Sequence, residues 1–438
     1  MSTEISDPRK RKYEEAFDKQ AEEKTKLKKD NESTSEFSKE HLQLYYEVLF
    51  PYEEVYDWLS YFDSENGKYW RNREFSFTTL NDTYSRFNSY NGVKEFKDDI
   101  KRICPLKIDI GAVYNVEPSR KQSVSQDKFV VEEKELVFDI DISDYDNVRT
   151  CCRNEEICEQ CWPLMACAIR VISRTLKEDF GFQHLLWVFS GRRGIHCWVG
   201  DALARRLDTS GRSAIVEYLK TYNGNSQNAV KVDLGNNLHE CLRRAYDVCI
   251  QYFQRVTIEK QTLLNDPKGI AEFVAMIRND KIRDSMKTAL HDDMSNTNGK
   301  TKLERINQVW NTAKQKYTSP KEKQLIEANR YECVFACTYP RLDVNVSKHV
   351  NHLLKCPFVV HPKTGRVCTI IDPDTCDHFN PNSQPVCFYL AIILYIVVYY
   401  IVVYYIVMCL FVCLFFFLFF FQSLDLISTY GPTECCFS

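Results

Sequence analysis

The sequence predicts an α+β protein in which a β-rich body is interrupted by a helical insertion. Strand-like segments dominate from about residue 74 to 199, with one helical stretch at 164–177. Residues 204–331 are polar, charged and patterned as helices, and strand-like segments return at about 339–371. The 438 residues suffice for two ordinary domains or for one large domain with an insertion. The net charge of −3 excludes no class of partner, because a nucleic-acid surface would be a local patch.

The first 41 residues are predicted to be a charged, disordered tail, because Lys, Glu, Asp and Ser abound and apolar residues are few. The run Arg9–Lys12 is a candidate nuclear import signal, although short basic runs are common in charged tails. The start of the chain lacks the apolar core of a signal peptide, so we expect the cytosol or nucleus, where thiols stay reduced. Apolar and aromatic residues then recur at helical spacing from Leu42 to Ser60 and predict an amphipathic helix.

Two aspartates lie on one face of the strand expected at 135–142. Side chains of a strand alternate between its two faces, so Phe138 and Ile140 would face a core. Asp139 and Asp141 would then emerge together on the opposite face. Adjacent carboxylates repel each other, and a bound divalent cation removes that repulsion. An exposed strand face with two solvated acids is the alternative interpretation.

Four of the chain's nineteen cysteines lie close together, directly after the acidic strand. They are Cys151, Cys152, Cys158 and Cys161. In a reducing compartment such a cluster indicates a metal site, and four thiolates fit a tetrahedral zinc ion. This zinc would be structural, because full thiolate ligation leaves no open position for catalysis. Free thiols packed under a loop are the alternative.

A glycine-rich basic loop is expected between two apolar strands at 184–189 and 195–199. Its polar members are Ser190, Arg192, Arg193 and His196. The glycines permit a tight turn and a close approach of the backbone, and the arginines can donate paired hydrogen bonds to phosphate oxygens. Further along the chain, Lys355 and His361 could reach the same anion. An ordinary basic turn is the alternative.

A third carboxylate, Asp343, lies in the segment 339–347, whose alternating pattern predicts another strand. Leu342, Val344 and Val346 would face inward and Asp343 outward. Beside the first two aspartates, it would complete a cradle for two Mg²⁺ or Mn²⁺ ions. Two-metal chemistry suits nucleotidyl transfer, because one ion activates the attacking hydroxyl group and the other stabilises the leaving pyrophosphate. An isolated surface acid is the alternative.

The composition of the chain changes abruptly at residue 387. Residues 387–421 carry no charge over 35 positions, and about 20 apolar residues suffice to span a bilayer. The run is low in complexity, which favours translated non-coding sequence, a gene-model artefact, over a true membrane span. The last four residues, Cys435–Ser438, formally fit a prenylation box. The expected organisation is a tail at 1–41, a core at 42–203 and 332–386 with the cysteine motif at 151–161, a helical subdomain at 204–331, and a hydrophobic tail at 387–438.

Several segments, in this order along the chain, resemble the catalytic (small) subunit family of the archaeo-eukaryotic DNA primases in its eukaryotic form. They are Arg73–Phe77, Lys107–Tyr114, Glu135–Asp146, the cysteine cluster with Trp162–Met165, Ser190–Trp198 and Tyr339–Arg366. Together they cover roughly residues 42–372. The resemblance implies a mixed α/β primase fold with a helical subdomain and a structural zinc motif. It also implies a nucleotidyltransferase, a DNA-directed RNA polymerase that makes short RNA primers on single-stranded DNA from ribonucleoside triphosphates.

The resemblance also assigns roles to individual residues. Asp139, Asp141 and Asp343 would be the ligands of the catalytic metals, and Cys151, Cys152, Cys158 and Cys161 those of zinc. The triphosphate would be held by Ser190, Arg192, Arg193, His196, Lys355 and His361. Asp109 is similar to the residue that senses the ribose 2′-hydroxyl group. Glu74, Tyr84 and Arg86 match positions near the active site, with Glu74 counted among the catalytic residues.

The implied partners are a large iron–sulfur primase subunit and DNA polymerase alpha, and the implied location is the nucleus, where the primosome initiates DNA replication. Membrane association would contradict this location and would require the run at 387–421 to be genuine. The family continues after Pro385 with a soluble, partly helical segment, which the hydrophobic run replaces here. The alternatives are a primase-polymerase that uses deoxynucleotides in repair or damage tolerance, and a catalytically idle, zinc-stabilised nucleic-acid-binding module.

Overall fold

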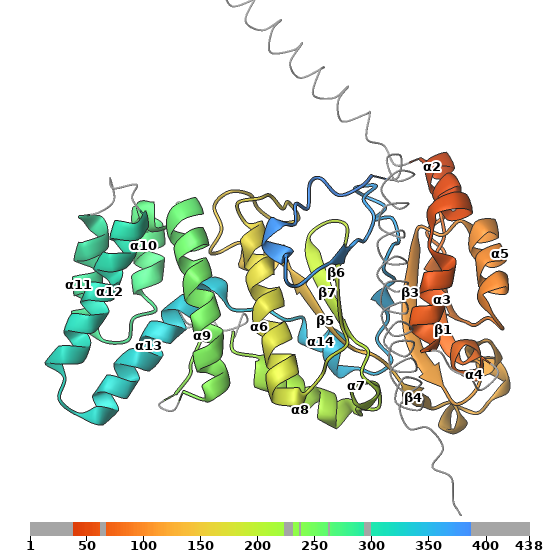
Figure 1. Cartoon of the computed structure of the whole chain (residues 1–438), viewed down its shortest axis with the longest axis horizontal. Helices are drawn as coiled ribbons and strands as arrows, with labels where there is room; N and C mark the ends of the chain where they lie inside the picture. The colour runs from red at the N-terminus through yellow and green to blue at the C-terminus, as the bar shows by residue number, and fades with distance from the viewer. Residues whose placement is uncertain are drawn as a thin grey trace, which may run out of the picture. The chain divides into compact units, whose positions relative to one another are not determined.

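The computed structural model describes residues 38–61, 67–222, 231–235, 238–261, 263–292 and 299–386 (Figure 1). Of the tail predicted at 1–41, residues 1–37, with Arg9–Lys12, lie outside these residues, as does the hydrophobic tail at 387–438. Residues 39–41, predicted to be disordered, are helical. In the part of the chain that the structure describes, no helix is both long enough and apolar enough to span a bilayer. Helices and two antiparallel sheets make up the fold, so the predicted α+β class is confirmed.

The first sheet has five strands, which follow the order β2-β1-β3-β4, with β8 also paired to β3. The strands are β1 (Arg73–Thr78), β2 (Tyr84–Asn88), β3 (Lys107–Tyr114), β4 (Val131–Glu133) and β8 (Leu354–Lys355). Helix α5 (Val93–Ile103) packs on this sheet through an aromatic cluster, in which the rings of Phe75 and Phe96 lie 4.9 Å apart. This helix was not expected within the strand-rich stretch.

The helix predicted at 42–60 is confirmed, but it is interrupted. It comprises α2 (Lys39–Leu44), one π-helical segment η1 (Tyr45–Leu49) and α3 (Tyr52–Ser60), with a break at Phe50, whose backbone is extended. The break coincides with Pro51, because the residue before a proline is pushed out of the helical region. The short helix α4 (Lys68–Arg71) then leads into β1.

The second sheet has four strands in the order β5-β7-β6-β9. They are β5 (Leu136–Asp141), β6 (Leu185–Phe189), β7 (Gly194–Val199) and β9 (Ile370–Ile371). Helix α6 (Trp162–Phe180), predicted at 164–177, packs on this sheet, where the Trp187 indole donates a hydrogen bond to Ser173 Oγ at 2.8 Å. Its side chains and those of β5, β6 and β7 share one large hydrophobic core. The 3₁₀ turns η2 (Pro118–Ser123), η3 (Gln126–Lys128), η4 (Ile142–Tyr145) and η7 (Cys376–His378) complete the β-rich body.

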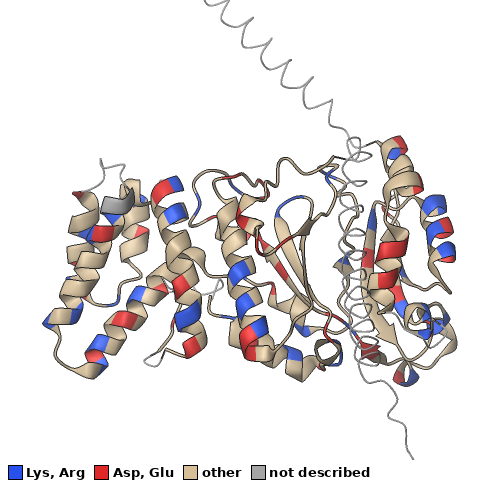
Figure 2. Ribbon diagram, viewed as in Figure 1, with Lys and Arg blue, Asp and Glu red and all other residues tan. Residues whose placement is uncertain are grey.

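The helical stretch after β7 is mostly regular, as its polar periodicity predicted. It comprises α7 (Ala202–Arg205), α8 (Thr209–Leu219), α9 (Glu240–Tyr252), η5 (Phe253–Lys260), η6 (Leu263–Asn265), α10 (Pro267–Val274), α11 (Asp280–His291), α12 (Gly299–Lys316) and α13 (Pro320–Thr338). Figure 2 shows acidic and basic residues side by side along these helices, as is usual for solvated helix surfaces. Because α13 continues to Thr338, a helix leads almost directly into the segment that holds Asp343.

The strand predicted at 339–347 is wrong. Asp343 is the N-cap of a short helix, α14 (Val344–Lys348), and its carboxylate accepts a hydrogen bond of 3.0 Å from the Asn345 N–H. Aspartate is one of the preferred N-cap residues, and this preference prevails over the short alternating pattern. The expected difference in burial is nevertheless present: Val346 is buried, Leu342 and Val344 pack against the core, and Asp343 is exposed.

Candidate active site

Asp139 and Asp141 project from β5 on the face opposite Phe138 and Ile140, as predicted. Phe138 and Ile140, which alternate with them, are fully buried, whereas both aspartates are partly exposed. In the ladder with β7, Asp139 lies opposite His196 and Asp141 lies opposite Gly194. The His196 Nε2 atom is 3.6 Å from Asp139 Oδ1. The strand therefore places both acids beside the residues of the basic loop.

Asp343 is brought to the same place by a backbone contact. Its N–H donates a hydrogen bond of 3.0 Å to the Asp139 carbonyl oxygen. Burial, and then the negative charge of Asp343, raise the pKa of Asp139 to about 6, against the opposing effect of Lys355 and Arg193. Burial and the neighbouring Asp139 likewise raise the pKa of Asp141. Three carboxylates thus converge, and the charges of their neighbours make Asp139 and Asp141 harder to ionise.

The donor set fits a divalent cation. Asp139 Oδ1 is buried and has no hydrogen-bond partner among the residues that the structure describes. A buried carboxylate oxygen that lacks a donor and lies near further carboxylates is the kind of ligand that Mg²⁺ or Mn²⁺ takes. The three carboxylates are more widely spread than a single closed site, since only the thiols of the cysteine cluster bring three or more potential ligand atoms within 4.8 Å in the described ranges.

The basic loop is a tight turn between β6 and β7. The Ser190 N–H donates to the Gly194 carbonyl oxygen at 2.9 Å, and the Gly194 N–H donates to Ser190 Oγ at 3.0 Å. Gly191 has a φ of +82°, and a Cβ atom there would lie 2.8 Å from the Cβ of His361. A Cβ atom on Gly194 would lie 2.5 Å from Asp141 Oδ1. Both glycines are therefore needed for the close approach of the loop to its neighbours.

Two cationic side chains connect this loop to the acids. Arg193 Nη2 lies 2.7 Å from Asp141 Oδ2. Lys355 Nζ donates to the Ser190 carbonyl oxygen at 3.3 Å and lies close enough to Asp139 to lower the pKa of that carboxylate. An anion bound at the loop would therefore compete with the aspartates of β5 for Arg193 and Lys355.

The two histidines of the predicted pocket are neutral at physiological pH. Burial, followed by the positive charge of Lys355, lowers the pKa of His196 to about 3. Burial, Lys355 and Arg192 lower the pKa of His361 to about 3 as well. Neutral imidazoles act as hydrogen-bond partners and add no charge to the site.

Asp109 lies in the first sheet and is connected to the acids of the second sheet by Lys355. It pairs with Ser76 on β1 and with Lys355 on β8. Burial raises the pKa of Asp109, and the nearby ammonium group of Lys355 opposes that shift. Lys355 therefore acts electrostatically on both Asp109 and Asp139, which belong to different sheets.

Glu74, Tyr84 and Arg86 also lie in the first sheet. The Glu74 carboxylate is fully buried and accepts hydrogen bonds from Arg86 Nε at 2.8 Å and from the Tyr114 hydroxyl group at 3.1 Å. The Tyr84 side chain is 53% exposed, and its hydroxyl group lies 3.3 Å from Ser76 Oγ. Glu74 is thus already satisfied by its protein partners, which favours a positioning role for it over proton transfer.

Asp144, His352 and Glu155 belong to this neighbourhood and were not predicted as site residues. Burial and the charge of Asp141 raise the pKa of Asp144, which lies one turn beyond β5. Burial and the charge of Lys134 lower the pKa of His352, and the negative charge of Asp343 opposes this shift. Glu155 forms ion pairs with the arginines of the loop. The acidic pattern at 139–144 could have indicated Asp144, whereas only the folded chain shows the other two.

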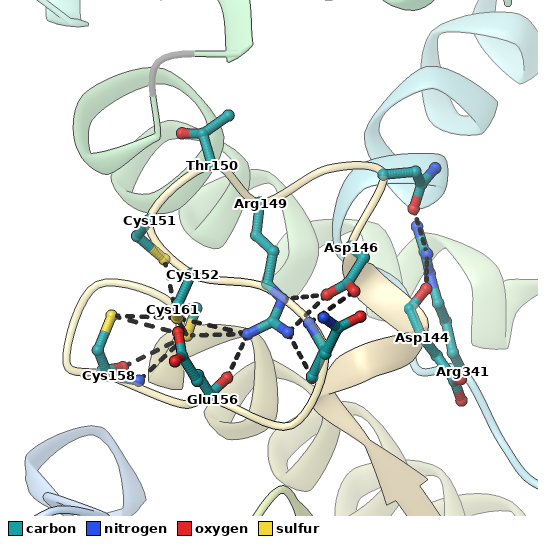
Figure 3. Close-up of polar contacts among 12 residues, drawn as sticks. Asp144, Asp146, Arg149, Thr150, Cys151, Cys152, Glu156, Cys158, Cys161 and Arg341 are labelled. Atoms are coloured by element: carbon teal, nitrogen blue, oxygen red, sulfur yellow. Dashed lines mark hydrogen bonds and ion pairs between the residues drawn. The ribbon is translucent and has the colours of Figure 1, made fainter.

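The four cysteines form one compact cluster (Figure 3). Neighbouring Sγ atoms lie 3.5–3.8 Å apart. Tetrahedral zinc with Zn–S bonds of about 2.3 Å requires S···S distances of about 3.8 Å, so the cluster fits this ion. Arg149 donates to Cys152 Sγ and Cys161 Sγ, and Gln261 donates to Cys151 Sγ at 3.4 Å. These donors orient the thiolates from outside the cluster.

The chain matches the DNA primase small subunit family over residues 138–373. It is 38% identical over 351 residues to the DNA primase small subunit of Drosophila melanogaster, covering 78% of this chain and 79% of that protein. The corresponding protein of Schizosaccharomyces pombe is 37% identical over 343 residues, 78% of this chain and 74% of its own length. That of Saccharomyces cerevisiae is 34% identical over 353 residues, with coverage of 80% and 84%.

Proposed function

Because the chain belongs to the DNA primase small subunit family, we propose that it is the catalytic subunit that makes RNA primers on single-stranded DNA from ribonucleoside triphosphates. The observation that carries this proposal is the alignment of Asp139 and Asp141 with the basic loop across one β-ladder. This arrangement holds a carboxylate cluster and a phosphate-binding loop side by side, as nucleotidyl transfer requires.

Asp139, Asp141 and Asp343 would hold the catalytic metals. Bound Mg²⁺ or Mn²⁺ lowers the pKa of a coordinated hydroxyl group and stabilises negative charge on phosphate oxygens. Zinc in the cysteine cluster would be structural, because all four positions of a tetrahedral site are filled by thiolates.

The basic residues would bind the triphosphate. Arg192 and Arg193 offer planar pairs of donors for phosphate oxygens, and Lys355 adds a point charge. Ser190, His196 and His361 would add neutral hydrogen bonds. Asp109, which the Lys355 side chain connects to this pocket, would accept a hydrogen bond from the ribose 2′-hydroxyl group.

The proposed setting is the nucleus, with a primase large subunit and the DNA polymerase alpha complex as partners, as the resemblance implies. A primase-polymerase that prefers deoxynucleotides is the second enzyme candidate. The two differ in sugar preference, so the ratio of ribonucleotide to deoxynucleotide incorporation separates them. A catalytically idle binding module does not explain why the chain holds three carboxylates together in a site that would face a DNA backbone.

The experiment that tests the proposal is unprimed synthesis of labelled RNA by the full chain on single-stranded DNA. Asp139→Ala and Asp343→Ala should abolish the product, and Asp98→Ala on the exposed face of α5 should leave it unchanged. Circular dichroism and zinc content should match the wild type in all three variants. Product formation by folded Asp139→Ala protein would contradict the assignment. If the wild type makes no product alone, extension of a supplied primer distinguishes a missing partner from a wrong function.

A further inference from the structure

Glu155 connects the cysteine loop to the two arginines of the basic loop. It lies between Cys152 and Cys158 in sequence, and its carboxylate forms an ion pair with Arg192. Its Oε1 atom also lies 3.5 Å from Arg193 Nη1. The side chains of Glu155, Arg192 and Arg193 are 38%, 22% and 41% exposed, so water and solutes reach them.

The carboxylate occupies donors that a phosphate group would use. A guanidinium group presents the same planar pair of N–H donors to a carboxylate and to a phosphate. Arg193 additionally donates to Asp141, so within the described residues both of its partners are carboxylates that repel an incoming anion. A triphosphate can engage these arginines fully only after Glu155 gives up its contacts.

We propose that Glu155 sets the affinity for the incoming triphosphate by occupying Arg192 and Arg193 until the nucleotide displaces it. This inference rests on the proposed function, in which these arginines bind the triphosphate. Because Glu155 belongs to the loop at 151–161, displacement would also release the contact between the zinc site and the basic loop. Glu155 is a positioning residue and takes no part in the chemical step.

The size of the effect follows from the exposure of the pair. Solvent-exposed ion pairs contribute little, and breaking one in competition with a ligand changes affinity roughly two- to five-fold. Removing the charge of Glu155 should therefore tighten anion binding by that factor. A residue that served only to stabilise the loop would instead weaken binding, or leave it unchanged, when replaced.

The test uses inorganic tripolyphosphate as the probe, because its binding does not depend on catalysis. Isothermal titration calorimetry on the full, zinc-loaded chain would compare the wild type with Glu155→Gln and with Glu156→Gln. Glu156 is the matched control, since its side chain is exposed and its contact with Arg149 is made through its backbone carbonyl group. We expect roughly two- to five-fold tighter binding in Glu155→Gln, no change in Glu156→Gln, and weaker binding in Arg192→Ala.

Primer synthesis gives a second reading of the same variants. In Glu155→Gln the KM for GTP should fall by the same factor as the Kd for tripolyphosphate, while kcat stays within about two-fold. Should Glu155→Gln lose zinc, Glu155→Asp provides the same comparison, because its shorter side chain keeps the charge and reaches the arginines less well.

Two results would overturn the inference in different ways. In the first, Glu155→Gln binds tripolyphosphate no more tightly than the wild type, and Arg192→Ala binds it more weakly. Glu155 then does not compete with the anion, and the loop remains the triphosphate site. Equal binding by the wild type and Arg192→Ala would remove the loop itself from phosphate binding. In that case the proposed nucleotide pocket would fail along with the role of Glu155.

Discussion

Arg73 and Glu135 form a paired ionic contact in the interior of the protein. The two terminal nitrogens of Arg73 each donate to one oxygen of Glu135 at 2.9 Å, and both side chains are fully buried. The Tyr61 hydroxyl group donates to the same carboxylate at 2.8 Å. Arg73 begins β1 and Glu135 immediately precedes β5, so this contact joins the sheet of Asp109 to the sheet of Asp139.

Breaking this pair from one side should destabilise the protein strongly. Arg73→Met leaves the Glu135 charge buried with little compensation, which typically costs about 3–5 kcal/mol of unfolding free energy. The double variant Arg73→Met, Glu135→Leu should cost less than Arg73→Met alone, because it also removes the carboxylate that Arg73→Met leaves without its main partner. Urea denaturation measures both. Arg102→Met breaks an exposed pair with Asp99 and should change stability by no more than about 0.5 kcal/mol. Equal losses of unfolding free energy in Arg73→Met and Arg102→Met would show that burial of the first pair makes no difference.

Lys134 should make the stability of the protein rise with pH above neutrality. Burial lowers its pKa to about 7, against the opposing charge of Glu135, while the unfolded chain keeps the ordinary value of 10.5. Between these values the unfolded state binds more protons, so the free energy of unfolding contributed by this group increases with pH. Lys134→Met should be more stable than the wild type at pH 6.5. The difference between their free energies of unfolding should become smaller by roughly 1–3 kcal/mol by pH 9.5. The free energies of unfolding are measured by urea denaturation at each pH. If the difference between the two proteins were the same at every pH in this range, the lowered pKa of Lys134 would be refuted.

Gly194→Ala should inactivate the enzyme without unfolding it. The added Cβ atom would stand 2.5 Å from Asp141 Oδ1 and 2.7 Å from the Ile140 carbonyl oxygen, so the carboxylate must move. Displacements of about 1 Å in catalytic groups cost on the order of 100-fold in rate. Gly92→Ala is the control, since nothing lies within 4 Å of its Cβ position. Primer synthesis and thermal melting should separate the two variants; wild-type activity in Gly194→Ala would show that Asp141 tolerates the shift.

Asp109→Ala should reduce the preference for ribonucleotides. A buried acceptor left without the 2′-hydroxyl group disfavours deoxynucleotides, and removing that acceptor removes the discrimination. We expect the ratio of kcat/KM for GTP to that for dGTP to fall by at least about tenfold. The measurement is single-nucleotide extension with each substrate. An unchanged ratio would mean that another residue reads the sugar, and a wild-type preference for dGTP would support the primase-polymerase alternative.

Cys158→Ser should release zinc and loosen the loop at 151–161. Four thiolates whose neighbouring Sγ atoms lie 3.5–3.8 Å apart match zinc, and a three-thiolate remainder binds it more weakly. Bound zinc measured by atomic absorption should fall well below one equivalent, and the melting temperature should fall with it. Cys241→Ser, outside the cluster, should retain the metal. Full zinc occupancy in Cys158→Ser would place the ion elsewhere.

The acidic strand and the basic loop were predictable because both rest on short-range patterns. Strict alternation placed Asp139 and Asp141 opposite Phe138 and Ile140, and burial follows that alternation in the structure. The glycines at 191 and 194 indicated a tight turn, and their surroundings leave no room for a side chain. In both cases the relevant physics acts between residues only a few positions apart.

Asp343 shows where such patterns fail. The sequence correctly predicts that Asp343 lies beside Asp139, but a few alternating residues cannot distinguish a strand from the first turn of a helix. Glu155 could not be found from the sequence at all. Its contact with Arg192 spans 37 positions and depends on how the cysteine loop folds back toward the turn between β6 and β7.

The register between β5 and β7 has a consequence for how the chain tolerates insertions and deletions. Because Asp139 faces His196 and Asp141 faces Gly194, the hydrogen-bond ladder fixes the acids relative to the loop. Deleting one residue within β5 would turn the carboxylates toward the hydrophobic core and the apolar side chains toward solvent. Length changes are therefore compatible with the site only outside this ladder, in connections such as the loop that precedes β4. The pairing of these two short strands thus sets the distance between the acids and the basic loop.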